Sequence, residues 1–461
     1  MITDASRVAA VALLAFVGYW STLQVPVSGD ASAHVYAAYS VVREGNVDLD
    51  EYGDQQPPLV YFWRDIGGHR YAPYLPGNTA LFVPFALAGT ALGVEPISLG
   101  AVGVLSKLAA SLYVAISVGA VYVALRTVVD ARVATYLSLA YAFGTYAFAV
   151  ASQVYWEHAP TLMLTAIALA LVSRAPSAPR AAAYAGLFAG AAVAVRPTNA
   201  FVAAALLATL ARVDSRVALR YVLWGVPAAA FLVTFDWLAY GSPFEVGRGP
   251  FLPGDLLTGT AGLLFSPSRG LLVYGPWIAL GLAALAFSWR GPGDHVRWTL
   301  RFGSLAVAAI IVLFGSYAEW WAGWSYGNRY LSDPAPLYVL GVADAFRRGW
   351  LTSAVARAAL AVAIGWSVLL QAIGAGLNYF YWRGLHWDAQ PDITYSTQRL
   401  WDWGNAQWQF LFARLILEPP AAMTVELLSL TLIIIAFALL GGRRVQARMK
   451  GAMKSSNVAR M

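Results

Sequence analysis

The chain has 461 residues, of which 59% are hydrophobic and 12% are charged. A soluble globular domain carries about twice that charged fraction, so the composition excludes an ordinary soluble protein and indicates a helical membrane protein. The net charge of +7 does not indicate a nucleic-acid partner, because the basic residues are divided among short loops between apolar runs. The absence of cysteine excludes disulfides and thiolate metal sites.

Apolar runs of membrane-spanning length recur from one end of the chain to the other. We therefore expect an all-α polytopic bundle of about 12 (11–13) transmembrane helices. The first run is long enough to span and has no small-residue cleavage site, so we interpret it as a retained anchor and not as a signal peptide. The predicted spans are 8–27, 97–125, 132–151, 159–173, 182–195, 198–211, 221–240, 271–288, 302–317, 334–345, 358–375 and 423–441.

Charge bias predicts the orientation of these spans in a plasma membrane. The arginine-rich loops all fall on one side, which the positive-inside rule assigns to the cytoplasm together with both termini. The segment 78–94 would invert every later loop if it crossed the membrane, so we predict a re-entrant or interfacial helix there. The basic tail 442–461 is a further candidate for contact with anionic membrane lipids.

The opposite, extracytoplasmic side receives the long loops. They hold nearly all the remaining carboxylates and several dense tryptophan clusters. We expect them to form one compact cap of loops and short juxtamembrane helices over a single membrane domain, residues 1–441. The cap consists of 28–96 (the first outer loop), 152–158, 241–270, 318–333 and 376–422 (the last outer loop).

Asp30 follows the first predicted span and precedes an amphipathic helical pattern over 31–43. One interpretation is a helix N-cap, a position that aspartate favours. The other is a catalytic base beside the membrane surface. Taken alone, the residue supports both equally, and the two roles can coexist because a cap uses one carboxylate oxygen.

Transfer of a sugar from a lipid phosphate requires one positioned carboxylate to take the acceptor proton, and cations to stabilise the leaving phosphate. Arg196, Arg269 and Arg329 lie in short polar turns at the outer ends of spans. Any one of them alone is equally well explained as a snorkelling contact with lipid headgroups. As a set, they favour phosphate binding.

Lys107 is a fourth cation, placed inside a long predicted span. An ionisable residue in such a place indicates a functional role, and its structural alternative is a buried ion pair with Asp236 or Glu319. Glu157 and His158, in a short outer loop, are candidates for a second acidic site or for acceptor binding, together with His34 and Glu319.

His34 lies one helical turn after Asp30, where it can tune the pKa of Asp30 or contact headgroups. With His69 and Glu157 it makes a divalent cation conceivable, but no spacing identifies a metal site, and no cofactor is predicted. Trp320, Trp324 and Tyr326 form an aromatic cluster suited to stacking against sugar rings.

Several stretches resemble the GT-C superfamily of membrane glycosyltransferases, in the branch of protein O-mannosyltransferases and the lipid A aminoarabinose transferase. Asp30 looks like the superfamily's catalytic aspartate in the first outer loop, and Trp156-Glu157-His158 is similar to its second acidic position. Where many members carry lysine before the proline pairs, this chain has Gln56 and Leu75. The other similar stretches are QQPPLVY at 55–61, RYAPYLPG at 70–77, LFSPSRG at 264–270 and WWAGWSYGNRY at 320–330.

The resemblance implies an inverting transfer from a polyprenyl- or dolichyl-phosphate sugar to an acceptor hydroxyl of a glycan, lipid or protein on the extracytoplasmic face. Asp30 would be the general base, with the outer arginines and Lys107 on the phosphate. The alternative is a transporter or flippase of lipid-linked sugar, which should place ionisable residues at the membrane midplane, whereas here they concentrate in outer loops. A diphosphate-linked donor and a non-catalytic scaffold also stay open.

Overall fold

The computed structural model describes residues 3–22, 25, 28–52, 63–96, 99–243, 251–323, 325–382 and 397–409. These residues are mostly helical, as predicted. The helices are α1 (Asp4–Trp20), α2 (Gly29–Arg43), α3 (Pro76–Ala91), α4 (Leu99–Leu125), α5 (Ala131–Phe143), α6 (His158–Ser173), α7 (Pro179–Ala183), α8 (Ala185–Val195), α9 (Asn199–Ala211), α10 (Ser215–Tyr240), α11 (Leu256–Phe265), α12 (Leu271–Tyr274), α13 (Ile278–Phe287), α14 (His295–Gly315), α15 (Ala335–Arg347) and α16 (Ala354–Trp382).

Shorter elements lie in the connections. They are the 3-10 turns η1 (Asp50–Tyr52), η3 (Arg329–Leu331), η5 (Thr397–Trp401) and η6 (Trp403–Asn405), the π-helical turn η2 (Ala147–Ala151), and the antiparallel hairpin of β1 (Arg64–Ile66) and β2 (His69–Tyr71). The predicted span 132–151 is therefore α5 followed by η2, with a break at Gly144. The predicted span 423–441, the tail 442–461 and the 55–61 motif lie outside the described residues.

Local sequence explains where many helices begin. The carboxylates of Asp130, Asp214, Asp255 and Asp294 accept backbone N–H groups in the first turns of α5, α10, α11 and α14, which is the usual chemistry of an N-cap. The same role predicted for Asp30 is wrong. Helix α2 begins at Gly29, two residues earlier than expected, and places Asp30 inside its first turn.

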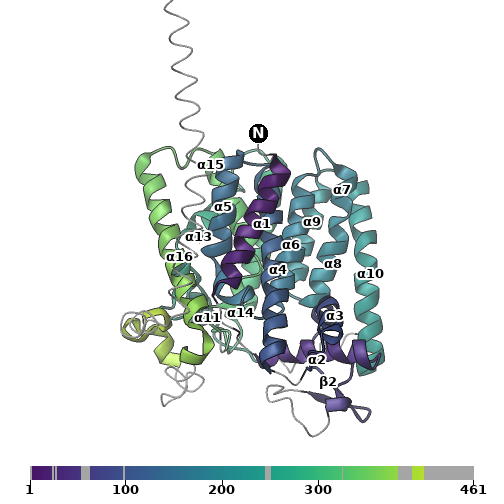
Figure 1. The fold of residues 1–461 in the computed structure, drawn as a ribbon. Coiled ribbons are helices and arrows are strands. Elements are labelled where there is room, and N and C mark those ends of the chain that lie inside the picture. Colours follow the sequence, from purple (N-terminus) through teal and green to yellow (C-terminus); the bar gives the residue numbers. More distant parts are fainter. Residues whose placement is uncertain are drawn as a thin grey trace, which may run out of the picture.

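The long helices run side by side and form a bundle with two ends (Figure 1). At the basic end, the Arg126 guanidinium lies 3.3 Å from the Asp4 carboxylate, and Arg347 pairs with Asp294. At the opposite end, which we call the α2 end, α2 lies across the bundle beside the hairpin. The membrane side that each end faces stays a prediction from charge bias.

Helix α3 contains most of the segment predicted not to cross the membrane. It packs along α2 over its whole length: the His34 imidazole and the Thr79 hydroxyl lie 3.4 Å apart near its start, and its Gly89 lies against the Tyr39 hydroxyl near its end. Since α2 lies across one end of the bundle, α3 stays at that end too (Figure 1). That this segment does not cross the membrane stays a prediction from charge bias.

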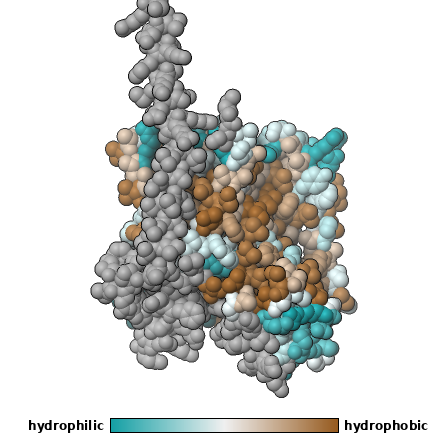
Figure 2. Space-filling view, in the orientation of Figure 1, coloured by the Kyte–Doolittle hydropathy of each residue, from teal (hydrophilic) through white to brown (hydrophobic). Residues whose placement is uncertain are grey.

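Four helices are long and apolar enough to cross a membrane by length and composition, namely Gly100–Leu125, Ser215–Tyr240, His295–Gly315 and Ala354–Gly376. The other apolar helices among the described residues, such as α6 and α9, have 10–17 residues, fewer than the ~20 that a straight crossing needs. The predicted number of 12 spans is therefore not established by helix length. Hydrophobic side chains nevertheless form a broad band between hydrophilic residues at the two ends (Figure 2).

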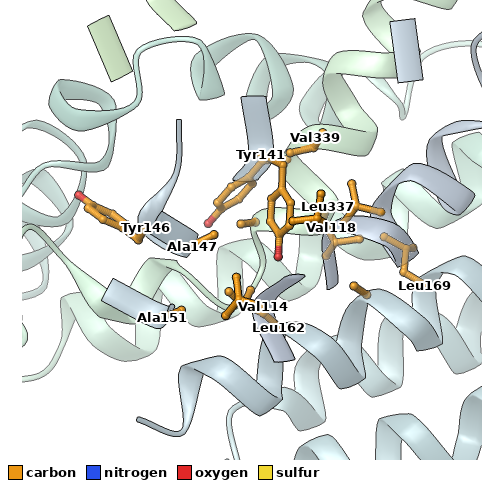
Figure 3. Close-up of a cluster of buried hydrophobic side chains, with 14 of the residues drawn as sticks. Val114, Val118, Tyr141, Tyr146, Ala147, Ala151, Leu162, Leu169, Leu337 and Val339 are labelled. Atoms are coloured by element: carbon orange, nitrogen blue, oxygen red, sulfur yellow. The ribbon is translucent and has the colours of Figure 1, made fainter. Parts of the chain in front are cut away.

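The core is built where helices approach closely. A Cβ on Gly281 would lie 2.3 Å from the Tyr338 carbonyl oxygen, so α13 and α15 pack backbone against backbone, as small residues allow in membrane bundles. The buried cluster around α4, η2, α6 and α15 fills the bundle centre (Figure 3). Its labelled members are Val114, Val118, Tyr141, Tyr146, Ala147, Ala151, Leu162, Leu169, Leu337 and Val339.

Candidate functional site

Asp30 lies at the α2 end, where both of its carboxylate oxygens accept hydrogen bonds from distant parts of the chain. The Tyr74 hydroxyl donates to Oδ1 at 2.8 Å, and Nη1 of Arg329 donates to Oδ2 at 3.0 Å. The side chain of Asp30 is 38% exposed and that of Arg329 is 20% exposed. The pair is therefore reachable from outside the bundle, as a reacting carboxylate must be.

Trp156 joins the elements around this pair. The Arg329 guanidinium lies over its ring, 4.9 Å from the centroid, and the indole N–H donates to the Ser28 hydroxyl at 2.7 Å. The start of α2, the turn before α6 and the loop after α14 therefore meet at one place. Among the predicted cations, Arg329 is the one whose ion pair with Asp30 is observed.

A second cluster of charged groups lies deeper at the same end. The His158 ring Nδ1 lies 2.7 Å from Asp333 Oδ1, and the Arg196 guanidinium pairs with the other oxygen of Asp333. Arg196 also lies 3.7 Å from Glu157, whose carboxylate is 3.9 Å from the His34 ring. The five side chains are nearly or fully buried. Three predicted acceptor-site residues and one predicted phosphate-binding residue thus belong to one network.

The neighbours of Asp333 in this network stabilise its ionised form. Burial alone would raise the pKa of the Asp333 carboxyl, but the Arg196 guanidinium and the His158 imidazole hold that pKa below its ordinary value. Asp333 is therefore ionised at neutral pH, and Arg196 is shared between two carboxylates. Breaking a buried pair of this kind leaves an uncompensated charge, which is strongly destabilising.

The two clusters are contiguous. The Ser332 hydroxyl donates to the Arg329 carbonyl at 2.6 Å and lies 3.1 Å from the His158 ring nitrogen. On the other side, the rings of His34 and Tyr74 lie 4.8 Å apart. A substitution at Asp333 or His158 can therefore alter the position of Arg329 through Ser332.

Arg269 occupies a different environment from the one expected of a phosphate ligand. It is 1% exposed, and its guanidinium donates to the main-chain carbonyls of Gly323, Ser325 and Gly327. Burial lowers the pKa of Arg269 to about 10, so the side chain stays cationic at neutral pH. These three carbonyls belong to the loop that leads to Arg329.

Lys107 is also buried, at 2% exposure on α4. Its ammonium donates to the Thr22 hydroxyl, which in turn donates to Gln153 Oε1 at 2.9 Å. The ammonium also faces the Trp20 ring at 5.9 Å. Lys107 thus links the end of α1 to the turn that carries Trp156 and Glu157.

Two of the aromatic residues predicted to stack on sugar, Trp320 and Tyr326, are packed against protein. Trp320 is 5% exposed and lies against Gly262 and the Trp401 ring, and the Tyr326 hydroxyl donates to the Leu370 carbonyl at 2.7 Å. Trp324 lies outside the described residues, and Glu319 is half-buried at the start of the same loop. The aromatic side chains observed beside the Asp30–Arg329 pair are Trp156, under the Arg329 guanidinium, and Tyr74, which donates to Asp30.

Within the described residues, one group has the geometry for a metal ion: Asp48, Asp50 and His69, whose ligand atoms all lie within 4.8 Å of one another. The pair of His69 Nδ1 and Asp50 Oδ2 is already 2.6 Å apart. His34 does not join this group, because it lies against Glu157. The predicted combination of His34 with His69 is therefore not observed.

Sequence reasoning did not assign Tyr74 or Asp333 to the site. Tyr74 stands inside the 70–77 stretch, and its aromatic hydroxyl two residues before Pro76 was the available signal. Asp333 follows Arg329 by four residues in an outer loop, a spacing that brings side chains together in a helical turn. Neither signal identifies the distant partner.

No family model and no curated protein matches the chain. Solved structures of the Archaeoglobus fulgidus oligosaccharyltransferase are similar to the chain. With a tethered acceptor peptide it is 13% identical, with 86% of this chain and 58% of that chain covered and a TM-score of 0.46. In its complex with Zn and sulfate it is 16% identical, with 86% of this chain and 57% of that chain covered and a TM-score of 0.46. In its complex with an inhibitory peptide and a dolichol-phosphate it is 12% identical, with 87% of this chain and 59% of that chain covered and a TM-score of 0.44.

The chain thus spans 57–59% of the length of these proteins. At this identity and superposition, the likeness is a similarity of layout that identifies neither the family nor the activity of this chain.

Proposed function

We propose that the chain is a membrane glycosyltransferase of the GT-C type. It would move a sugar from a polyprenyl- or dolichyl-phosphate donor to an acceptor hydroxyl at the α2 end of the bundle. The observation that supports this proposal most is the ion pair of Asp30 and Arg329, separated by 3.0 Å and partly exposed over Trp156. It combines a base and an anion-binding group in one place.

The reaction needs little more than these two groups. The acceptor oxygen attacks the anomeric carbon while its proton passes to Asp30, which acts as general base. The bond between the anomeric carbon and the phosphate oxygen breaks, and its electron pair leaves with the phosphate. Arg329 stabilises that developing charge. Attack from the side opposite the phosphate inverts the configuration of the sugar.

The resting contacts suggest how the donor prepares the site. An arginine binds phosphate as readily as carboxylate, often through two parallel hydrogen bonds. A donor phosphate would therefore draw Arg329 away from Asp30 Oδ2 and leave that oxygen to the acceptor hydroxyl. The Tyr74 hydroxyl, 2.8 Å from Oδ1, would keep the carboxylate oriented during this exchange.

The buried network supplies the framework for Arg329. Since Arg196 is already shared by Asp333 and Glu157, we assign it a secondary role on the phosphate, together with Lys107. Glu157 stays the candidate for the acceptor side. Asp30 and Glu157 offer oxygens that suit a divalent cation, but both oxygens of Asp30 accept from Tyr74 and Arg329. These contacts suit a base better than a metal ligand, and no metal step is proposed.

The test is to incubate the purified protein in lipid nanodiscs with a panel of polyprenyl-phosphate sugars and a membrane extract as acceptor source. Mass spectrometry then follows both products. We expect one sugar to appear on an acceptor while the free polyprenyl phosphate appears in equal amount. Movement of intact donor across the bilayer with no such release would instead indicate a transporter or flippase.

A further inference from the structure

The loop between α14 and η3 carries an unusual backbone. Ala322 has a φ of 66°, and Gly323 and Gly327 have φ values of 59° and 60°. A residue with a Cβ in this left-handed region is strained, so the surroundings must hold Ala322 in place. Arg329 follows two residues after Gly327, which makes its position depend on how this loop is held.

Two side chains from other parts of the chain hold the loop. Arg269 Nη1 donates to the Ser325 carbonyl, to the Gly327 carbonyl at 3.0 Å and to Gln407 Oε1 at 3.0 Å, while Nη2 donates to the Gly323 carbonyl at 3.2 Å. Gln407 Oε1 also accepts the Gly327 N–H at 3.0 Å. Both side chains are nearly fully buried, at 1% and 2% exposure.

The turn that contains Arg269 and the segment 397–409, which contains Gln407, are also joined by hydrogen bonds. The Ser266 hydroxyl donates to the Leu400 carbonyl at 2.6 Å, and the Trp408 indole N–H donates to the Pro267 carbonyl at 3.2 Å. The turn before α12, the loop after α14 and the segment 397–409 therefore form one junction. A loop tied at three carbonyls by a planar guanidinium has few alternative positions.

The last link runs from Gly327 to Arg329. The Asn328 amide donates to the Trp320 carbonyl at 3.0 Å, and its Oδ1 accepts the Tyr330 N–H at 3.0 Å. The residue between the clamp and Arg329 is therefore held on both sides. The backbone between Gly327 and Arg329 therefore has few alternative conformations.

We infer that Arg269 and Gln407 form a clamp that positions Arg329 against Asp30, and that Arg269 is not itself a ligand of the donor phosphate. Both are positioning residues, which act through the loop 320–328. The inference rests on the proposed function for its kinetic consequences, while the clamp itself can be measured without activity. It assigns to Arg269 a role different from the one expected from sequence, and a role to Gln407 that sequence did not indicate.

The first test uses hydrogen–deuterium exchange of the full-length protein in detergent. We expect Arg269→Lys and Gln407→Leu to raise exchange at least tenfold in peptides covering 318–332, because a lysine has no fork to hold three carbonyls. Two controls match these variants. Arg301→Lys alters another buried arginine, which donates to the carbonyls of Ser288 at 2.9 Å and Gly291 at 2.6 Å, and Gln409→Leu alters a neighbouring glutamine. Unchanged exchange in the first two variants overturns the inference.

The second test is a double-mutant cycle on transferase rates. Misplacement by about 1 Å can reduce a rate by about 100-fold, so we expect Arg269→Lys to lower kcat at least tenfold with the donor KM changed less than threefold. In an Arg329→Ala background the same change should alter kcat less than twofold. Equal losses in both backgrounds would mean that Arg269 acts on the donor directly, which contradicts the clamp.

The two tests separate the inference from the proposed function. If the wild-type protein transfers no sugar, the proposed function fails, and the exchange experiment alone decides whether the clamp exists. If Arg269→Lys does not fold, both measurements are made on Gln407→Leu, which removes the side-chain amide of the clamp and keeps the Arg269 guanidinium.

Discussion

Replacing Arg329 by alanine is the most informative perturbation of the candidate site after Asp30 itself. Arg329 forms an ion pair with Asp30 and lies over the ring of Trp156. The substitution removes the guanidinium and leaves the buried Arg196 network intact. It therefore separates a loss of phosphate stabilisation from a loss of fold.

The structure sets the expected magnitudes. The ion pair is partly exposed, with side-chain exposures of 20% and 38%, so its contribution to folding is about 0–1 kcal/mol. A preorganised group that stabilises developing charge contributes about 2.7–4 kcal/mol to the transition state, equivalent to a loss of about 100- to 1000-fold in kcat. The rate should thus fall far more than the stability.

The assay measures initial rates at saturating acceptor while the donor concentration is varied, with the melting temperature recorded for each variant. Arg329→Lys should fall between wild type and Arg329→Ala, because a point charge replaces a planar fork. Arg43→Ala is the matched control, since Arg43 also forms an exposed ion pair on α2, with Glu95 at 2.9 Å. If Arg329→Ala keeps the wild-type donor KM and kcat, the phosphate site lies elsewhere and the reasoning is refuted.

Three further predictions concern the fold and its titration. Asp333→Asn should lower the free energy of unfolding by about 3–5 kcal/mol, because buried Arg196 loses one of its two carboxylate partners. An unchanged thermal unfolding midpoint would contradict the network. Gly281→Val should abolish assembly of the bundle, because its Cβ would meet a carbonyl of α15 at 2.3 Å, whereas Gly365→Ala, with nothing within 4 Å of its Cβ, should express normally. The hydrogen bond from His69 to Asp50 raises the pKa of His69 above its ordinary value of 6.5. The stabilisation that His69 gains from this pair is therefore complete below pH 6.5 and is lost as the pH rises through the raised pKa. NMR titration of the Asp50→Asn variant should show the pKa of His69 returning to its ordinary value.

Much of the fold could be predicted because its signals are local. Each apolar run carries its own helical propensity, and caps such as Asp214 and Asp294 mark where α10 and α14 begin. The charge of the loops predicts that α3 does not cross the membrane, and this stays a prediction. The cap role of Asp30 failed because Ser28 occupies the N-cap position of α2, while Asp30 directs both oxygens to Tyr74 and Arg329.

The site could be predicted only as a set of candidates. Asp30 and Arg329 are 299 positions apart, and loop topology could bring them to the same end without indicating which arginine faces the carboxylate. That choice depends on packing: Arg269 is turned toward main-chain carbonyls by a loop whose left-handed Ala322 no local pattern predicts. Asp333 was missed because its importance comes from Arg196, which lies 137 positions away.

The proposed reaction requires Asp30 to remove the proton of the acceptor hydroxyl. Once the donor is known, single-turnover transfer is followed with Asp30→Asn, while binding of the same donor is measured in parallel. Asp214→Asn, which changes a helix-capping carboxylate of α10 to a residue that caps equally well, serves as control. We expect the Asp30→Asn variant to bind the donor but to transfer sugar about 100- to 10,000-fold more slowly. A transfer rate within twofold of wild type would contradict it.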